Sequence, residues 1–109
     1  MPRDEVEAAY FTLLRAREEL DALRRYEEYL VAEAQRLRRS RSEADALRDG
    51  VDRRLLRALR HSEVPLAQAV TERLAVLAEE AASLPERILA AEAYVEACER
   101  THQQLRSGA

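Results

Sequence analysis

Arginine is the residue type in this chain with the clearest capacity for binding chemistry. All 18 basic Lys or Arg positions are arginines. Residues 36–61 hold nine of them against four acidic residues, whereas the segments before and after are both net acidic. Guanidinium groups bind carboxylates and phosphates through paired hydrogen bonds. We therefore predict an anion-binding or partner-binding region, with candidates Arg38, Arg39, Arg41, Arg53, Arg57 and Arg60.

The predicted ligand of these arginines is an acidic protein surface or an anionic nucleotide. Arg53, Arg57 and Arg60 are three and four residues apart, so they share one face of a helix. We do not expect nucleic acid as the ligand. No aromatic residue lies between the arginines, and the acidic remainder of the protein chain would repel the phosphate backbone. The alternative interpretation is a solvated polar end without a ligand.

Few other residues suggest chemistry. Glu99 and His102 have the spacing of carboxylate-bridged di-metal bundles, but further inward carboxylates at the same level are missing. The single cysteine, Cys98, lies at an apolar position of the heptad pattern, and we predict that it is a small buried hydrophobic residue. There is no nucleophile–base pair and no glycine-rich phosphate loop. The sequence thus predicts no enzyme activity, no metal and no cofactor.

The elements that would position these residues are long helices with a heptad repeat. In residues 67–105, eleven of twelve positions in two interleaved heptad series, a and d, are apolar, and only His102 is not. The first helix repeats the pattern, and Glu27 is the one charged residue at its a and d positions. The a series are 6, 13, 20, 27, 34 and 67, 74, 81, 88, 95, 102; the d series are 9, 16, 23, 30, 37, 44 and 70, 77, 84, 91, 98, 105. These apolar seams predict an all-α coiled coil.

Helix boundaries follow from capping residues and prolines. We predict one domain with a helix over about 4–48, a short basic helix over about 52–60 and a long kinked helix over about 63–106. Gly50 is the expected left-handed cap of the first helix, and Asp52 and Ser62 are expected to cap the next two. Pro85 should kink the long helix, since the heptad phase is the same on both sides of it; two collinear helices meeting near Ser83 are the alternative.

Charged positions beside the seam predict how the long helices pair. In an antiparallel hairpin Arg17 meets Glu99, Arg24 meets Glu92 and Glu33 meets Arg87. A parallel pairing of two first helices also matches charges, and both pairings can coexist if two hairpins form a four-helix bundle. Apolar residues off the seam, at Tyr10, Phe11 and Leu14, favour such a homodimer or form a docking patch for another protein.

The layout of helices and arginines resembles helical anti-sigma hairpins that bind cyclic di-GMP, but the signature of that group is missing. Starting at Glu33, its spacing falls on Leu37, Ser40, Ala44 and Arg48 instead of Ser, Arg, Gln and Asp. We expect a cytoplasmic protein without a membrane span, acting as a non-enzymatic coiled-coil module that binds protein: a regulator, adaptor or assembly factor. The alternative is an anti-sigma-like switch whose arginine-rich end binds a nucleotide or an acidic surface.

Overall fold

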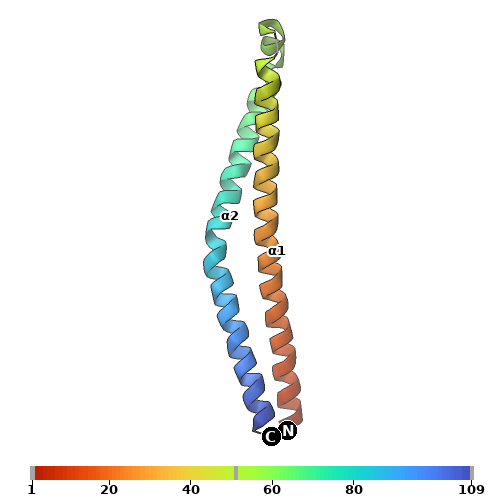
Figure 1. Ribbon diagram of the computed structural model, residues 1–109, viewed down its shortest axis with the longest axis vertical. Helices are drawn as coiled ribbons and strands as arrows, with labels where there is room; N and C mark the ends of the chain where they lie inside the picture. The colour runs from red at the N-terminus through yellow and green to blue at the C-terminus, as the bar shows by residue number, and fades with distance from the viewer. Residues whose placement is uncertain (1, 51, 109) are drawn as a thin grey trace. The chain divides into compact units, whose positions relative to one another are not determined.

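The chain folds as an all-α helical hairpin, as predicted. The computed structural model describes residues 2–50 and 52–108, without the side chains of residues 2, 3, 59, 61 and 62. Helix α1 is Pro2–Asp49, with 48 residues, and helix α2 is Arg53–Ser107, with 55 residues. The two helices run in opposite directions beside each other (Figure 1). No strand occurs within the described residues.

The turn between the helices confirms one predicted cap and corrects another. The Asp52 carboxylate accepts a hydrogen bond from the Arg54 N–H at 3.4 Å, so Asp52 caps α2 as expected. Gly50 was predicted to be a left-handed cap, but no described glycine has a positive φ. Its N–H instead donates to the carbonyl of Leu47 at 3.2 Å. A tight last turn therefore ends α1 at Asp49, with Gly50 outside the left-handed region.

Helix α2 continues through both places where a break was considered. The predicted helices 52–60 and 63–106 fall within this one helix, so the boundary expected at residues 61–65 is wrong. The backbone of Ser62, the predicted cap, is helical, and its side chain lies outside the described residues. Pro65 and Pro85 each remove one backbone donor, and the neighbouring hydrogen bonds are enough to carry the helix past both.

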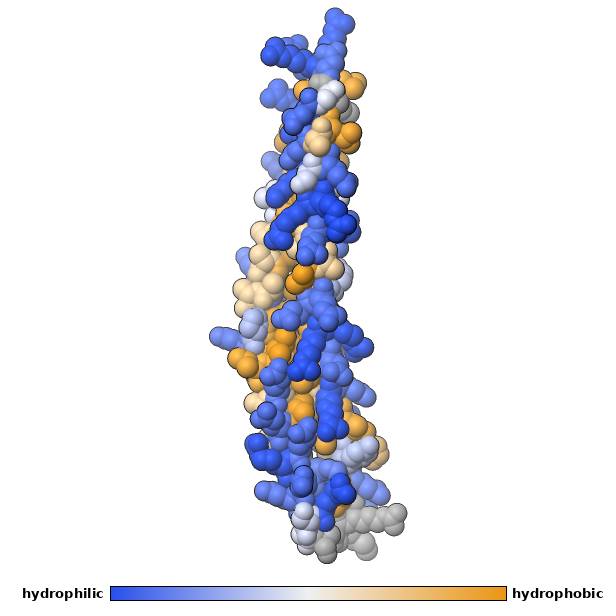
Figure 2. All heavy atoms as spheres, viewed as in Figure 1, coloured by the Kyte–Doolittle hydropathy of each residue, from blue (hydrophilic) through white to orange (hydrophobic). Residues whose placement is uncertain are grey.

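Burial confirms the predicted seam. Every buried apolar side chain in the described part of the chain falls in the a or d series; they are Leu13, Ala16, Leu20, Leu30, Leu37, Leu77, Leu84, Val95 and Cys98. Fully burying one large aliphatic side chain is worth about 1.5–3 kcal/mol. On the face shown in Figure 2, hydrophobic side chains form a broken stripe among hydrophilic ones. Glu27, the charged residue in the seam of α1, is exposed, because a side chain of that length at the seam can reach solvent.

The hairpin divides into two compact units, of which the first joins Met1–Glu28 to Ser83–Ala109. Its core is a cluster of Leu13, Ala16, Leu20, Val95 and Cys98, with Ile88 and Ala91 against it. Two predicted ion pairs span the helices, because Arg17 binds Glu99 and Arg24 binds Glu92, each at 3.2 Å between Nη2 and Oε1. They confirm the antiparallel register, while the exposed pairs themselves contribute under about 1 kcal/mol each.

The second unit is Tyr29–Ala82, and it contains the turn. Its buried side chains are Leu30, Leu37 and Leu77. Glu33 pairs with Arg36 on its own helix at 2.7 Å, and this hydrogen bond lowers the pKa of Glu33. The predicted pair of Glu33 with Arg87 stays a prediction. No described side chain between residues 38 and 76 is buried, so the seam stays open toward the turn.

The described helices contain no stretch apolar and long enough to cross a membrane.

Candidate functional site: an arginine-lined groove

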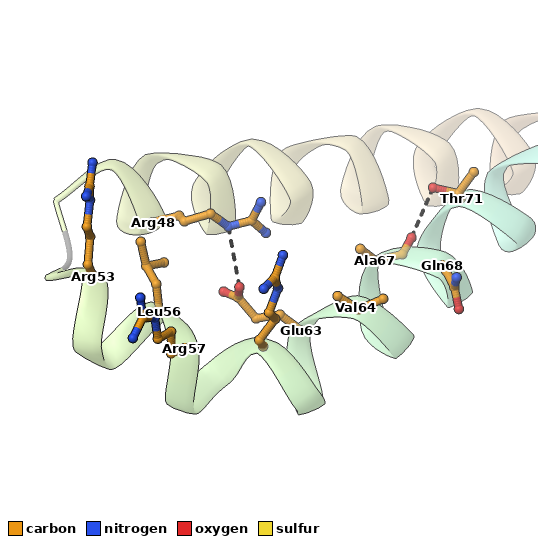
Figure 3. A pocket seen from close by; sticks show the side chains of 10 residues that line it. Arg48, Arg53, Leu56, Arg57, Glu63, Val64, Ala67, Gln68 and Thr71 are labelled. Atoms are coloured by element: carbon orange, nitrogen blue, oxygen red, sulfur yellow. Dashed lines mark hydrogen bonds and ion pairs between the residues drawn. The ribbon is translucent and has the colours of Figure 1, made fainter.

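A groove of about 550 Å³ lies in the second unit, where the seam is open. Figure 3 shows its walls, with Arg48 reaching from α1 and the other labelled side chains coming from α2. Four arginines and one glutamate supply the charge, and three small or aliphatic residues supply the apolar surface. The charged and apolar lining residues are Arg48, Arg53, Arg57, Arg60, Glu63, Leu56, Val64 and Ala67. We call this site the arginine groove.

The heptad pattern explains why a groove forms here. Continued toward the turn, the a series of α2 falls on Arg60 and Arg53, and the d series falls on Glu63 and Leu56. Long charged side chains are not buried in a two-helix core, because desolvating them costs several kcal/mol. Ala67, the next a residue, is too small to fill the space that a leucine would occupy. The positions that close the seam elsewhere therefore leave this part open.

Within the described part of the chain, ion pairs occupy only one of the four groove arginines. Arg48 Nε lies 3.4 Å from Glu63 Oε2, and Arg48 Nη1 lies 4.0 Å from Asp45 Oδ1. Arg53, Arg57 and Arg60 form no ion pair or hydrogen bond through their side chains with any other described residue. All three are exposed. The groove thus presents three unpaired guanidinium groups beside the half-buried Leu56 and the half-exposed Val64.

The structure separates the predicted arginines into two groups. Arg53, Arg57 and Arg60 line the groove together, as their shared helix face indicated. Arg38, Arg39 and Arg41 lie on α1, are exposed and do not line it. Arg48 lines the groove but was not among the predicted site residues. Its position in the a series of α1, seven residues after Arg41, was the signal that could have found it.

The second predicted site, the aromatic patch of the first unit, is exposed as well. Phe11 is 65% exposed and Tyr10 is 44% exposed, whereas Leu14 is half-buried. The Tyr10 ring lies 6.0 Å from the Phe11 ring and 5.6 Å from the His102 ring, measured between centroids. His102, the one polar residue in the seam between positions 67 and 105, therefore packs against an aromatic ring instead of entering an apolar core.

Tyr94 extends this patch across to α2, which the sequence did not indicate. Together with Phe11, Arg15 and Glu19 it lines a shallow hollow of about 260 Å³. A hydrogen bond with the Cys98 side chain and, secondly, the negative charge of the Cys98 thiolate raise the pKa of Tyr94. Its phenol adds a polar aromatic surface beside Phe11.

Glu99 and His102, which have the spacing of a metal-binding motif, contact different residues in the structure. Glu99 accepts a hydrogen bond from Arg17 at 3.2 Å, and His102 contacts Tyr10. No group of three or more potential metal-binding side chains comes together within the described residues.

Comparison with protein-family models, with curated proteins and with solved structures found no match to this chain. Its function is therefore inferred from the groove and the aromatic patch.

Proposed function

We propose that this protein is a non-enzymatic interaction module, a regulator, adaptor or assembly factor, that binds an acidic protein segment in the arginine groove. The observation that carries this proposal is a set of three exposed arginines, Arg53, Arg57 and Arg60, that have no acidic partner among the described residues and lie beside an apolar surface. Its one cysteine is buried and unpaired, so the fold needs no disulfide and suits a reducing cytoplasm.

The chemistry of the groove favours a segment that carries carboxylates next to an apolar side chain. Each guanidinium can form charge-assisted hydrogen bonds with a carboxylate, and these are stronger than bonds between neutral groups. Leu56, Val64 and Ala67 can cover an apolar side chain between them. Complementary charge mainly raises the association rate and the specificity, and the buried apolar contact holds the complex.

Reversing the three groove charges should abolish partner binding. We expect proteins captured from cell extract by the wild type to be lost with the Arg53→Glu, Arg57→Glu, Arg60→Glu variant. A matched control changes Arg38, Arg39 and Arg41 to Glu, which alters net charge equally but outside the groove. Capture is measured by quantitative mass spectrometry, and circular dichroism checks that both variants keep their helicity.

The two variants make the result specific to the groove. Loss of capture with both would indicate a response to net charge alone. Full capture by the groove variant would refute the proposal and leave the arginines as a solvated end. The aromatic patch of Tyr10, Phe11 and Leu14 would then be the next candidate binding surface.

A nucleotide is the second candidate ligand, favoured by the same three arginines, because guanidinium groups bind phosphate as readily as carboxylate. A ligand present at about 100 times its Kd stabilises the folded state by roughly 2.7 kcal/mol, which a thermal-shift assay detects easily. If the protein is a nucleotide-responsive switch, a cyclic dinucleotide should raise the Tm of the wild type and of the Arg38, Arg39, Arg41 control but not of the groove variant. Unchanged Tm values with every nucleotide tested would exclude this candidate.

Homodimer formation is part of the proposal. Phe11 and Tyr94 are each more than half exposed in the first unit, and they form an apolar aromatic surface that a second copy could cover.

A further inference from the structure

The outer face of α1 in the first unit carries a regular pattern of acidic and apolar residues. Six residues at alternating spacings of three and four lie opposite the seam, on one side of the helix. Acidic residues stand at both ends, with the two apolar ones in the middle. They are Asp4, Glu7, Phe11, Leu14, Glu18 and Asp21. We call them the acidic face.

The charges of this face are available to a partner. Asp4, Glu18 and Asp21 are exposed and form no ion pair or side-chain hydrogen bond with any other described residue. Phe11 is 65% exposed between them. Burying this exposed ring in a partner would be favourable, since it removes a large apolar area from water.

The acidic face and the arginine groove have complementary chemistry. The groove presents Arg53, Arg57 and Arg60 beside the apolar residues Leu56, Val64 and Ala67, and the face presents carboxylates beside Phe11 and Leu14. Docking would place the aromatic ring against the apolar residues and the carboxylates beside the guanidinium groups. Arg53, Arg57 and Arg60 in the groove form no ion pair with a described residue, and neither do Asp4, Glu18 and Asp21 on the face, so no ion pair of these six must break first.

We propose that the arginine groove of one copy of this chain binds the acidic face of a second copy. This inference rests on the proposed function, because it names the acidic segment that the groove takes. Every chain carries both surfaces, so the contact can form twice in a closed two-fold pair or repeat in an open assembly. A partner protein with a stronger acidic segment would compete with the second copy for the groove, which couples assembly to partner binding.

Two charge-reversed variants test this contact. The groove variant carries Arg53→Glu, Arg57→Glu and Arg60→Glu, and the face variant carries Asp4→Arg, Glu18→Arg and Asp21→Arg. Sedimentation at micromolar concentration and low salt should give the wild type at least about twice the 12.5 kDa chain mass. Each variant alone should sediment as a monomer, because its groove and face then have like charge.

An equimolar mixture of the two variants tests directly whether the groove of one copy contacts the acidic face of another. The acidic groove of one variant matches the basic face of the other, and the remaining groove and face keep their native charges. Equimolar mixing should therefore restore the wild-type mass, and about 1 M salt, where the Debye length is about 3 Å, should dissociate it. Circular dichroism of each variant excludes loss of the helices as the cause of dissociation.

The outcomes separate this inference from the proposed function. A monomeric wild type, or a mixture that stays monomeric although both variants are helical, overturns the proposed contact. Capture of acidic partners by the groove can still hold in that case, since it is measured with the groove variant and its matched control. A variant that self-associates like the wild type also overturns the contact, and it assigns dimerisation to another surface.

Discussion

Replacing Leu84 by alanine should lower the free energy of unfolding by about 2–5 kcal/mol, the usual cost of removing a buried leucine side chain. Leu84 is the most buried large residue of the described chain, with 0% of its surface exposed. In a domain of about 100 residues each kcal/mol moves the Tm by roughly 4–8 °C, so a fall of about 10 °C or more is expected. Thermal and urea unfolding followed by circular dichroism measure it.

Leu89 provides the matched control for this substitution. It lies in the same helix and in the same unit, but 65% of its surface is exposed. Leu89→Ala should change stability by no more than about 0.5 kcal/mol, as is usual for surface positions. Equal effects of the two substitutions would contradict the burial pattern, and with it the assignment of positions 84 and 89 to the inside and outside of the hairpin.

Replacing Pro85 by alanine should have the opposite sign and raise stability. A proline inside a helix costs about 3 kcal/mol relative to alanine, because it removes one backbone hydrogen bond and crowds the preceding turn. Proline also lowers the conformational entropy of the unfolded chain, which offsets about 0.4–1 kcal/mol of that cost. Pro85 is exposed and lies within the continuous helix α2, so its removal leaves no cavity. We expect a net gain of about 2 kcal/mol.

Glu86→Ala serves as the control for this gain. Glu86 is the exposed neighbour of Pro85, and its replacement by alanine changes only helix propensity, which is worth a few tenths of a kcal/mol. Urea unfolding of the three proteins gives the comparison. A loss of stability in Pro85→Ala would show that the ring makes a favourable contact that outweighs the missing hydrogen bond.

The sequence by itself was enough to predict the hairpin, its apolar seam and its register. A heptad pattern reports directly which side of a helix is buried, and the nine buried residues all lie in the predicted series. Opposite charges beside the seam selected the antiparallel pairing, which the Arg17–Glu99 and Arg24–Glu92 contacts confirm. Both inferences depend on local periodicity, which the amino-acid order contains in full.

The ends of the helices were harder to predict, because local signals compete with the rest of the helix. Ser62 and Pro65 resemble the start of a new helix, yet the backbone hydrogen bonds on both sides carry α2 through them. Gly50 resembles a left-handed cap, yet its N–H donates to the Leu47 carbonyl with an ordinary φ. At each position several backbone solutions differ by about 1 kcal/mol, and the packed helices select one.

The composition of the arginine groove was decided only by the tertiary structure. Nine arginines between residues 36 and 61 made a basic region evident, but their order did not show which would share a cavity. Arg48 belongs to the groove and is held by Glu63 on the opposite helix, whereas Arg38, Arg39 and Arg41 lie outside it. Two features separate these groups of arginines: the side chains of α2 that leave the seam unfilled, and the acidic residue that the Arg48 guanidinium reaches on the opposite helix. Both features depend on how the two helices pack.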